Sequence, residues 1–229
     1  MDHNMVTVTA FGVISVGDNT GFGDTECLPA SIGYGAIAPY FALLDVRKGK
    51  GKGFYRISSK RRELRRARRE VLRGFPAFSR LKLKWMLVLT YLDVGLVEGY
   101  FKHGDLNTFQ AIVTTDGKHS FAIFYYNKLK WAKKDVPVYP FPGMDRFAER
   151  ASASAGFDRG DRSHFALFKH SCTKDIGQVL LSESNVCSPG MWIFRIDGPT
   201  IQSAGCDPNA KDDHVLRVCN KKEECDTSN

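Results

Sequence analysis

The chain has 229 residues, of which 43% are hydrophobic, and it carries a formal net charge of +8 at pH 7. A chain of this size and apolar content can bury a substantial core, which excludes disorder throughout and allows one large domain with or without a small appendage. Its longest apolar runs lie between residues 85 and 92, far short of the roughly 20 residues that a bilayer span needs, so we expect no transmembrane helix.

Most of the positive charge lies in one short segment. Residues 60–73 contain eight basic residues and two glutamates, a net charge of +6, so the rest of the chain carries only +2. An anionic partner would therefore be met by this segment and not by the surface as a whole.

The N-terminal part of the chain is typical of β-strands separated by glycine-rich loops. Residues 5–16 predict two short strands around Phe11-Gly12, and residues 37–46 predict a third strand. The Lys-Gly repeats at 48–53 are interpreted as a loop tip, with residues 54–57 as the returning strand.

A helix is predicted over residues 60–73, with Ser59 as its cap and with Gly74 and Pro76 ending it. Spacings of three and four residues place one narrow apolar stripe on this helix, made of Leu64, Ala67, Val71 and Phe75. The remaining surface of the helix is almost entirely arginine, from Arg61, Arg62, Arg65, Arg66, Arg68, Arg69 and Arg73.

These seven arginines are the candidate binding residues of the chain. Planar guanidinium groups match sulfate and phosphate, so the helix could bind a polyanion such as heparan sulfate. The alternative is a solvated face in which Glu63 and Glu70 form helical ion pairs. Nucleic acid would use the same charges, but no reading motif or interleaved aromatic residue accompanies them, which disfavours it as a partner.

Residues 107–126 carry the strongest β pattern, two runs of β-branched and aromatic residues joined at Asp116-Gly117. Asp-Gly between such runs predicts a two-residue type I′ turn, because both central residues of that turn need positive φ. Counting outward from this turn pairs Ile112 with Phe121. Apolar pairs then fall on both faces of the hairpin, so we expect it in the middle of a sheet.

The segments around this hairpin complete a mainly β chain. A strand is predicted over residues 81–91, a β region over 154–181 that includes the apolar run 177–181, and a final strand over 191–197. We expect an antiparallel, sandwich-like β fold with one surface amphipathic helix, or α+β if the helix and loops are counted. After Gly198 the composition becomes polar and cysteine-bearing, which predicts a domain over 1–198 and a tail over 199–229.

The six cysteines favour an oxidising environment, because four of them lie in the last 43 residues. Cys172 and Cys187 are the favoured disulfide, with two free buried thiols as the alternative. Cys206, Cys219 and Cys225 are interpreted as the start of a further disulfide module, into which Cys27 could pair. With His214 they could instead form a zinc site, but they lack a tight Cys-x2-Cys knuckle.

No arrangement of residues in the sequence points to catalysis. The histidines are scattered, and neither a Gly-x-Ser-x-Gly elbow nor a His-Glu-x-x-His motif organises them. Asp45, Asp93 and Asp116 do not form a loop of alternating carboxylates, as a calcium site would. We therefore expect no enzyme activity, no cofactor and no metal.

The order of these segments resembles the nidogen-type extracellular domain (NIDO). The resemblance covers roughly residues 6–198 and is carried by two blocks, Asn-Thr-Phe-Gln followed by Thr-Asp-Gly at 107–117, and Ser-Asn-Val followed by Pro-Gly-x-Trp-x-Phe-Arg-x-Asp at 184–197. Either block alone would be weak, but the combination is specific.

The resemblance implies an extracellular location, a role in cell–matrix adhesion or matrix assembly through protein or glycosaminoglycan partners, and no catalytic residues. The chain departs from the family pattern in its missing upstream strand and signal sequence, in Cys172 and Cys187, and in its arginine-dense helix. The first departure predicts an N-terminally truncated domain. An intracellular protein that binds nucleic acid through the helix is the alternative function.

Overall fold

The computed structural model describes residues 6–17, 27–29, 33–46, 51–96, 105–132, 152–206, 214–216 and 218. Within them, a five-stranded sheet has the order β1-β2-β3-β9-β10, with β1 at Val6–Val8, β2 at Ile14–Val16, β3 at Gly35–Phe41, β9 at Ser154–Asp158 and β10 at Phe165–Leu167.

The second sheet is larger and supports the helix. Its order is β12-β11-β8-β7-β6-β4, and β5 also pairs with β6. Its strands are β4 at Leu44–Asp45, β5 at Lys52–Ser58, β6 at Trp85–Leu96, β7 at Asn107–Thr115, β8 at Ser120–Lys128, β11 at Met191–Arg195 and β12 at Gln202–Ser203. All strand pairings in both sheets are antiparallel.

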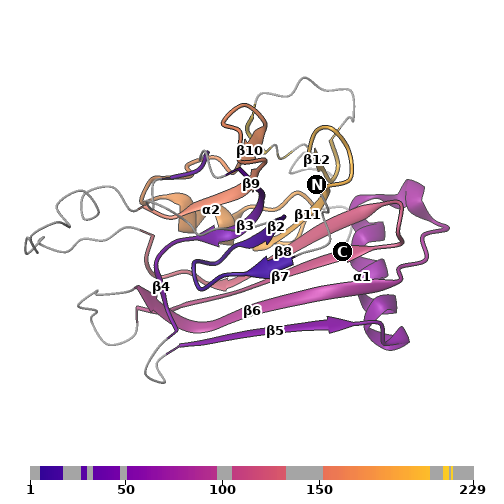
Figure 1. Cartoon of the computed structure of the whole chain (residues 1–229), viewed down its shortest axis with the longest axis horizontal. Coiled ribbons are helices and arrows are strands. Elements are labelled where there is room, and N and C mark those ends of the chain that lie inside the picture. The colour runs from indigo at the N-terminus through magenta and orange to yellow at the C-terminus, as the bar shows by residue number, and fades with distance from the viewer. Residues whose placement is uncertain are drawn as a thin grey trace, which may run out of the picture.

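The molecule has three layers, with the seven-stranded sheet between the five-stranded sheet and the helix α1 at Arg61–Gly74 (Figure 1). Side chains alternate along each strand, so one face of the larger sheet packs toward the five-stranded sheet and the other toward α1. On β6, for example, Leu87 and Leu89 enter the main core, while Met86 and Val88 cluster with Ala67 of α1. The predicted sandwich-like β fold with a surface helix is confirmed.

The central hairpin lies in the interior of the larger sheet, as predicted, but its register is shifted. Ile112 pairs with Ile123 and not with Phe121, because the loop has four residues, 116–119, and not two. The Asp116 carboxylate accepts hydrogen bonds from the backbone N–H groups of Lys118 and His119 at 2.8 and 2.7 Å, which stabilises the longer loop. A shift of two residues keeps every side chain on its predicted face.

The helix α1 forms where the apolar stripe predicts it. Ala67, Val71 and Phe75 are buried against the sheet, and Leu64 is partly buried there. The predicted cap differs, since Lys60 occupies the N-cap position without a side-chain hydrogen bond.

One predicted strand pairing and one predicted strand are wrong. Residues 54–57 do form a strand, as part of β5, but β5 does not return along the preceding strand. Both β4 and β5 pair antiparallel with β6, so the two strands run in the same direction along one edge of β6, and β5 continues where β4 ends. The apolar run 177–181 is part of the helix α2 at Ile176–Ser182, and a 3-10 helix, η1, occupies Pro76–Phe78.

The predicted disulfide between Cys172 and Cys187 is also wrong, because Cys172 is bonded to Cys27 across 145 residues. The two chain segments meet beside the start of β9, where the backbone N–H of Cys172 donates to the carbonyl of Ala153 at 2.9 Å. The backbone N–H of Leu28 donates to the hydroxyl of Ser154 at 3.4 Å in the same region. Cys187 and Cys206 are disulfide-bonded as well, while Cys219 and Cys225 lie outside the described residues.

Two buried asparagines explain the sequence blocks that carry the family resemblance. Asn107 donates to the carbonyl of Trp131 at 3.0 Å and accepts from the backbone N–H of Lys130 at 2.7 Å. Asn185 donates to the carbonyl of Ile193 at 2.7 Å and accepts from the backbone N–H of the same residue at 2.9 Å. Both side chains are fully buried and satisfy backbone groups that water cannot reach, so their role is structural.

The predicted boundary after Gly198 stays a prediction. Beyond it, β12 pairs with β11, and Ala204 packs into the core beneath α1. Further along, Leu167 of β10 forms an isolated parallel bridge with Val215, and Leu216 is buried in the main core.

Candidate anion-binding surface

Helix α1 holds its arginines on the outside because its apolar stripe faces the sheet. The buried Ala67 and Val71 fix the rotation of the helix about its axis, so residues on the opposite side of the wheel must point to solvent. Six of the seven predicted arginines are exposed, namely Arg61, Arg62, Arg65, Arg66, Arg69 and Arg73. We refer to these six residues as the arginine face.

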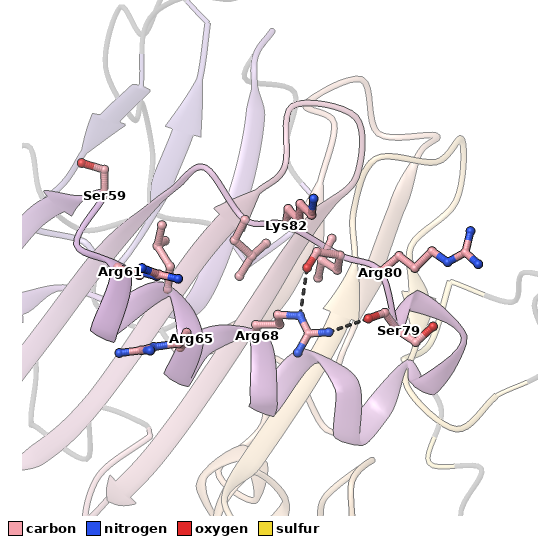
Figure 2. Close-up of a pocket in the computed structure, with 10 residues that line it drawn as sticks. Ser59, Arg61, Arg65, Arg68, Ser79, Arg80 and Lys82 are labelled. Carbon is pink, nitrogen blue, oxygen red and sulfur yellow. Dashed lines mark hydrogen bonds between the residues drawn. The ribbon is translucent and has the colours of Figure 1, made fainter.

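Arg68 has a different position from the other six. Its guanidinium donates to the carbonyl of Leu81 at 2.9 Å and to the carbonyl of Ser79 (Figure 2). These bonds attach α1 to the segment that leads into β6. Two of the donors that an anion would need on Arg68 are thus already used within the protein.

Most of the arginine face has no carboxylate partner. Arg73 forms an ion pair with Glu70 at 3.3 Å, and Glu63 pairs with Arg56 of β5 at 3.2 Å. Among the described residues, no ion pair forms at Arg62, Arg65, Arg66 or Arg69. Of the two predicted helical ion pairs only that of Glu70 forms, with Arg73 at the end of α1, whereas Glu63 pairs with β5 instead.

The unpaired charges disfavour the helix that carries them. Arg62, Arg65, Arg66 and Arg69 lie three or four residues apart, where like charges repel each other. Arg61 and Arg62 also lie in the first turn, where the helix dipole disfavours cations. A bound anion would remove both costs at once.

The arginine face borders a groove on each side of α1. A smaller groove of about 510 Å³ lies between α1 and residues 79–83, and Arg61 and Arg65 line it together with Arg80 and Lys82 (Figure 2). A larger groove of about 1210 Å³ lies between α1 and the sheet, lined by Arg62, Arg66, Arg69 and Arg73 from α1, by Arg56 from β5 and by Tyr125 from β8.

The larger groove also contains a neutral hydrogen-bonding group. Burial, with a smaller contribution from the Glu70 carboxylate, raises the pKa of Tyr125 to about 12, although Arg66 and Arg73 act in the opposite direction. The phenol therefore keeps its proton at neutral pH and can donate to an anionic group.

Three cations of these grooves are not part of the predicted set. Arg80 and Lys82 alternate with the apolar residues Leu81 and Leu83, so the period-two pattern of this segment could have placed them on one exposed side. Arg56 reaches α1 only because β5 pairs with β6, and no local sequence pattern indicates that pairing.

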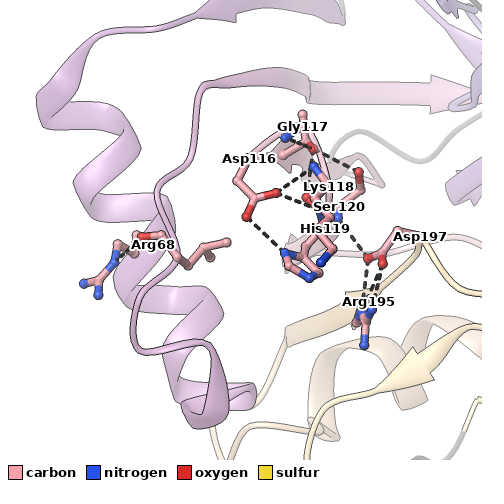
Figure 3. A network of polar contacts seen from close by, with 10 residues as sticks. Arg68, Asp116, Gly117, Lys118, His119, Ser120, Arg195 and Asp197 are labelled. Carbon is pink, nitrogen blue, oxygen red and sulfur yellow. Dashed lines mark hydrogen bonds and ion pairs between the residues drawn. The ribbon is translucent and has the colours of Figure 1, made fainter.

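A second polar cluster surrounds the tip of the hairpin (Figure 3). His119 pairs with Asp116 at 3.0 Å, and its ring packs edge-on against Phe78 with centroids 4.9 Å apart. Arg195 pairs with Asp197 at 2.8 Å and lies over the same phenyl ring at 5.2 Å. This cluster joins the hairpin to η1 and β11.

The carboxyl of Asp116 makes stability depend on pH. Burial alone would raise its pKa, but hydrogen bonds from the backbone N–H groups of His119 and Lys118, and from the His119 ring, lower the pKa to about 2. The unfolded value is about 3.9, so between these values the unfolded chain binds more protons than the native chain. The stabilisation is present above the unfolded pKa and is lost as the pH falls through about 2.

We therefore expect Asp116→Asn to flatten the decline in unfolding free energy between about pH 4 and about pH 2. Denaturant titrations of both chains across this interval measure the difference in slope. Parallel curves for the two chains would show that Asp116 does not contribute in this way.

A serine, a histidine and an aspartate that could suggest a hydrolase lie together in the turn before β10. The hydroxyl of Ser163 and the carboxylate of Asp161 both contact Nδ1 of His164, at 3.1 and 2.7 Å. A proton relay needs the aspartate and the serine on opposite nitrogens of the ring. The carboxylate also accepts the backbone N–H groups of Ser163 and His164, so the arrangement closes a turn.

Neither helix in the described part of the chain has the length and apolar composition of a membrane span. The same residues contain no group of three or more histidine, cysteine or acidic side chains placed to hold a metal ion. The zinc alternative also needs Cys206 as a thiolate, and this cysteine is disulfide-bonded.

The sequence of this chain is similar to those of several known proteins. The family model described as the nidogen-like domain matches residues 4–198. Alpha-tectorin of Gallus gallus is 29% identical over 230 residues, which cover 98% of this chain and 10% of that protein. Alpha-tectorin of Mus musculus is 30% identical over 210 residues, covering 89% of this chain and 9% of that protein.

Human nidogen-1 is 29% identical over 176 residues, covering 72% of this chain and 14% of that protein. The chain therefore spans only about a tenth of the length of the alpha-tectorins that it matches. No solved structure matches it significantly.

Proposed function

The chain belongs to the nidogen-like domain family, and from this premise we propose that it is a non-enzymatic extracellular module for cell–matrix adhesion or matrix assembly. We propose further that the arginine face of α1 binds glycosaminoglycan chains.

The cysteines support the extracellular location. No cysteine in the described part of the chain is free, and Cys27, Cys172, Cys187 and Cys206 are all disulfide-bonded. Disulfides form and persist in secreted proteins, whereas cytosolic thiols are kept reduced. This observation disfavours the intracellular protein that binds nucleic acid.

The unpaired arginines of α1 are the observation that carries the binding proposal. Exposed arginines at three- and four-residue spacing gain little within the protein and repel one another. A sulfated polymer would supply many anionic groups along the helix, each able to accept two parallel hydrogen bonds from a guanidinium. The grooves on both sides of α1 add Arg56, Arg80 and Lys82 to the same positive surface.

Replacing Arg62, Arg65, Arg66 and Arg69 with glutamine should abolish salt-sensitive retention on immobilised heparin. The melting temperature should not fall, because these side chains are exposed and their mutual repulsion is removed. Elution from heparin along a salt gradient and thermal unfolding measure the two effects.

A matched control removes the same amount of charge elsewhere. Glutamine at Lys118, Arg159, Lys169 and Lys174, all of them exposed and distant from α1 in sequence, also removes four positive charges. This variant should elute from heparin close to the unmodified chain. Equal losses of retention in both variants would mean that net charge, and not the arginine face, determines binding.

A further inference from the structure

Strand β5 is a long sheet edge with exposed side chains. Among the described residues it pairs only with β6, and six of its seven residues are exposed. The end strands of both sheets other than β5 have only two or three residues, namely β1, β10, β12 and β4. Proteins usually protect a long edge, since its free N–H and C=O groups can pair with another strand.

One face of β5 is apolar and uncovered. Tyr55 pairs with Leu89 and Ile57 pairs with Leu87, so all four side chains lie on the same face of the sheet. The two leucines are buried in the main core, whereas Tyr55 is 71% exposed and Ile57 is 73% exposed. In the part of the chain that the structure describes, the five-stranded sheet therefore does not extend over β5.

The opposite face of β5 is positively charged. Arg56 lies there and lines the larger groove beside α1, together with Arg62 and Arg66. Five arginines and two glutamates line this groove, so its charged groups sum to +3. A strand added to β5 would thus meet Lys52, Arg56 and the exposed Phe54 on one face, and Tyr55 and Ile57 on the other.

We propose that β5 accepts an extended segment of a partner protein in which acidic and apolar residues alternate. Successive side chains of a strand point to opposite faces, so the acidic residues would face Arg56 and α1, and the apolar residues would cover Tyr55 and Ile57. Backbone hydrogen bonds to the free edge supply affinity, and the two unlike faces select the sequence.

Charge selects such a partner over a second copy of this chain. Two β5 strands paired antiparallel about Tyr55 would place Lys52 opposite Ser58 and Arg56 opposite Phe54, with no acidic residue in either strand. The joined sheet would also carry two arginine faces on one side. An acidic segment avoids this repulsion and offers carboxylates to the groove. The proposal does not depend on glycosaminoglycan binding.

Two synthetic peptides of identical composition test the proposal on the full chain. One is a labelled heptapeptide in which Glu alternates with Ile and Val, and the other has its glutamates grouped at one end. Fluorescence anisotropy should show that the alternating peptide binds at least about tenfold more tightly, because only its order puts each residue type on one face. Hydrogen exchange should slow at the backbone amides of β5.

Variants of the protein distinguish peptide binding at the β5 edge from general attraction between opposite charges. Serine at both Tyr55 and Ile57 removes the apolar face without changing the charge. This variant should bind the alternating peptide about tenfold more weakly than the unmodified chain does. Val6→Ser is the matched control, because Val6 is 48% exposed on the edge strand β1 of the other sheet. This control should bind as the unmodified chain does.

Equal affinity for both peptides would overturn the proposal. Slowed hydrogen exchange that occurs at amides outside β5 and not at those of β5 would also overturn it. A concentration-dependent dimer whose β5 amides are protected without peptide would also overturn it, because the edge would then belong to a second copy.

Discussion

Replacing both Cys27 and Cys172 with serine should lower the free energy of unfolding by about 5 kcal/mol, the chain-entropy value for a loop of this length. The bond joins residues that are 145 positions apart. In the unfolded chain it therefore restricts most of the domain, and its loss leaves a much larger ensemble of unfolded conformations. The expected loss is comparable with the whole stability of many domains. Denaturant titration of the double variant and the unmodified chain measures the difference.

The control for this prediction leaves the other bonded cysteines in place. Reducing agent would also open the disulfides of Cys187 and Cys206, so the double substitution is the cleaner perturbation. Cys27→Ser and Cys172→Ser alone should each lose nearly as much stability as the double variant, since either change removes the same bond. A double variant within about 0.5 kcal/mol of the unmodified chain would contradict the prediction, because that is the effect of an ordinary surface substitution.

Phe124→Ala should lower the free energy of unfolding by about 3–5 kcal/mol, the usual range for a large aromatic residue in a core. Phe124 is fully buried on β8, and its ring stacks on Phe157 of β9 with centroids 5.6 Å apart. Phe194 of β11 and Phe168 also lie beside it, at 5.8 and 6.4 Å. The ring thus joins the two sheets, and alanine would leave a cavity that both sheets border.

Two further variants test whether the loss of stability comes from the buried position of Phe124. Phe124→Leu keeps most of the volume and should cost clearly less than alanine. Phe54→Ala removes the same side chain from β5, where it is 52% exposed, and should change stability by no more than about 0.5 kcal/mol. Similar losses for Phe54→Ala and Phe124→Ala would show that the aromatic cluster between the sheets is not a main source of stability.

The sequence predicts α1 well because local spacing determines it. Leu64, Ala67 and Val71 define the buried side, and the arginines must then face solvent. Spacing does not separate Arg68 from its neighbours. Its bonds to Ser79 and Leu81 depend on how the chain turns after the helix, and that turn is a tertiary feature.

The hairpin is predicted only in part from its local sequence pattern. Alternation predicts which face each side chain takes, and this survives the two-residue shift in register. The shift itself comes from the Asp116 side chain, which accepts backbone N–H groups and so stabilises a longer loop than Asp-Gly alone indicates.

Three features depend on contacts that are distant in sequence. The pairing of β5 with β6, the bond between Cys27 and Cys172, and the helical state of α2 all require the assembled fold. The apolar run in α2 is too short for periodicity to distinguish a buried helix from a strand. Its Ile176 and Leu180 are helical because both must reach the same core.

The C-terminal segment crosses from one sheet to the other, and this has a mechanical consequence. Strand β12 pairs with β11 of the larger sheet, while the backbone of Leu167 in β10 exchanges hydrogen bonds with His214 and Leu216, at 2.9 and 2.7 Å. Tension applied to the chain beyond Leu216 would load the five-stranded sheet first and the larger sheet next. Such a force would first separate Leu216 from the main core and from β10, and only then act on the pairing of β12 with β11.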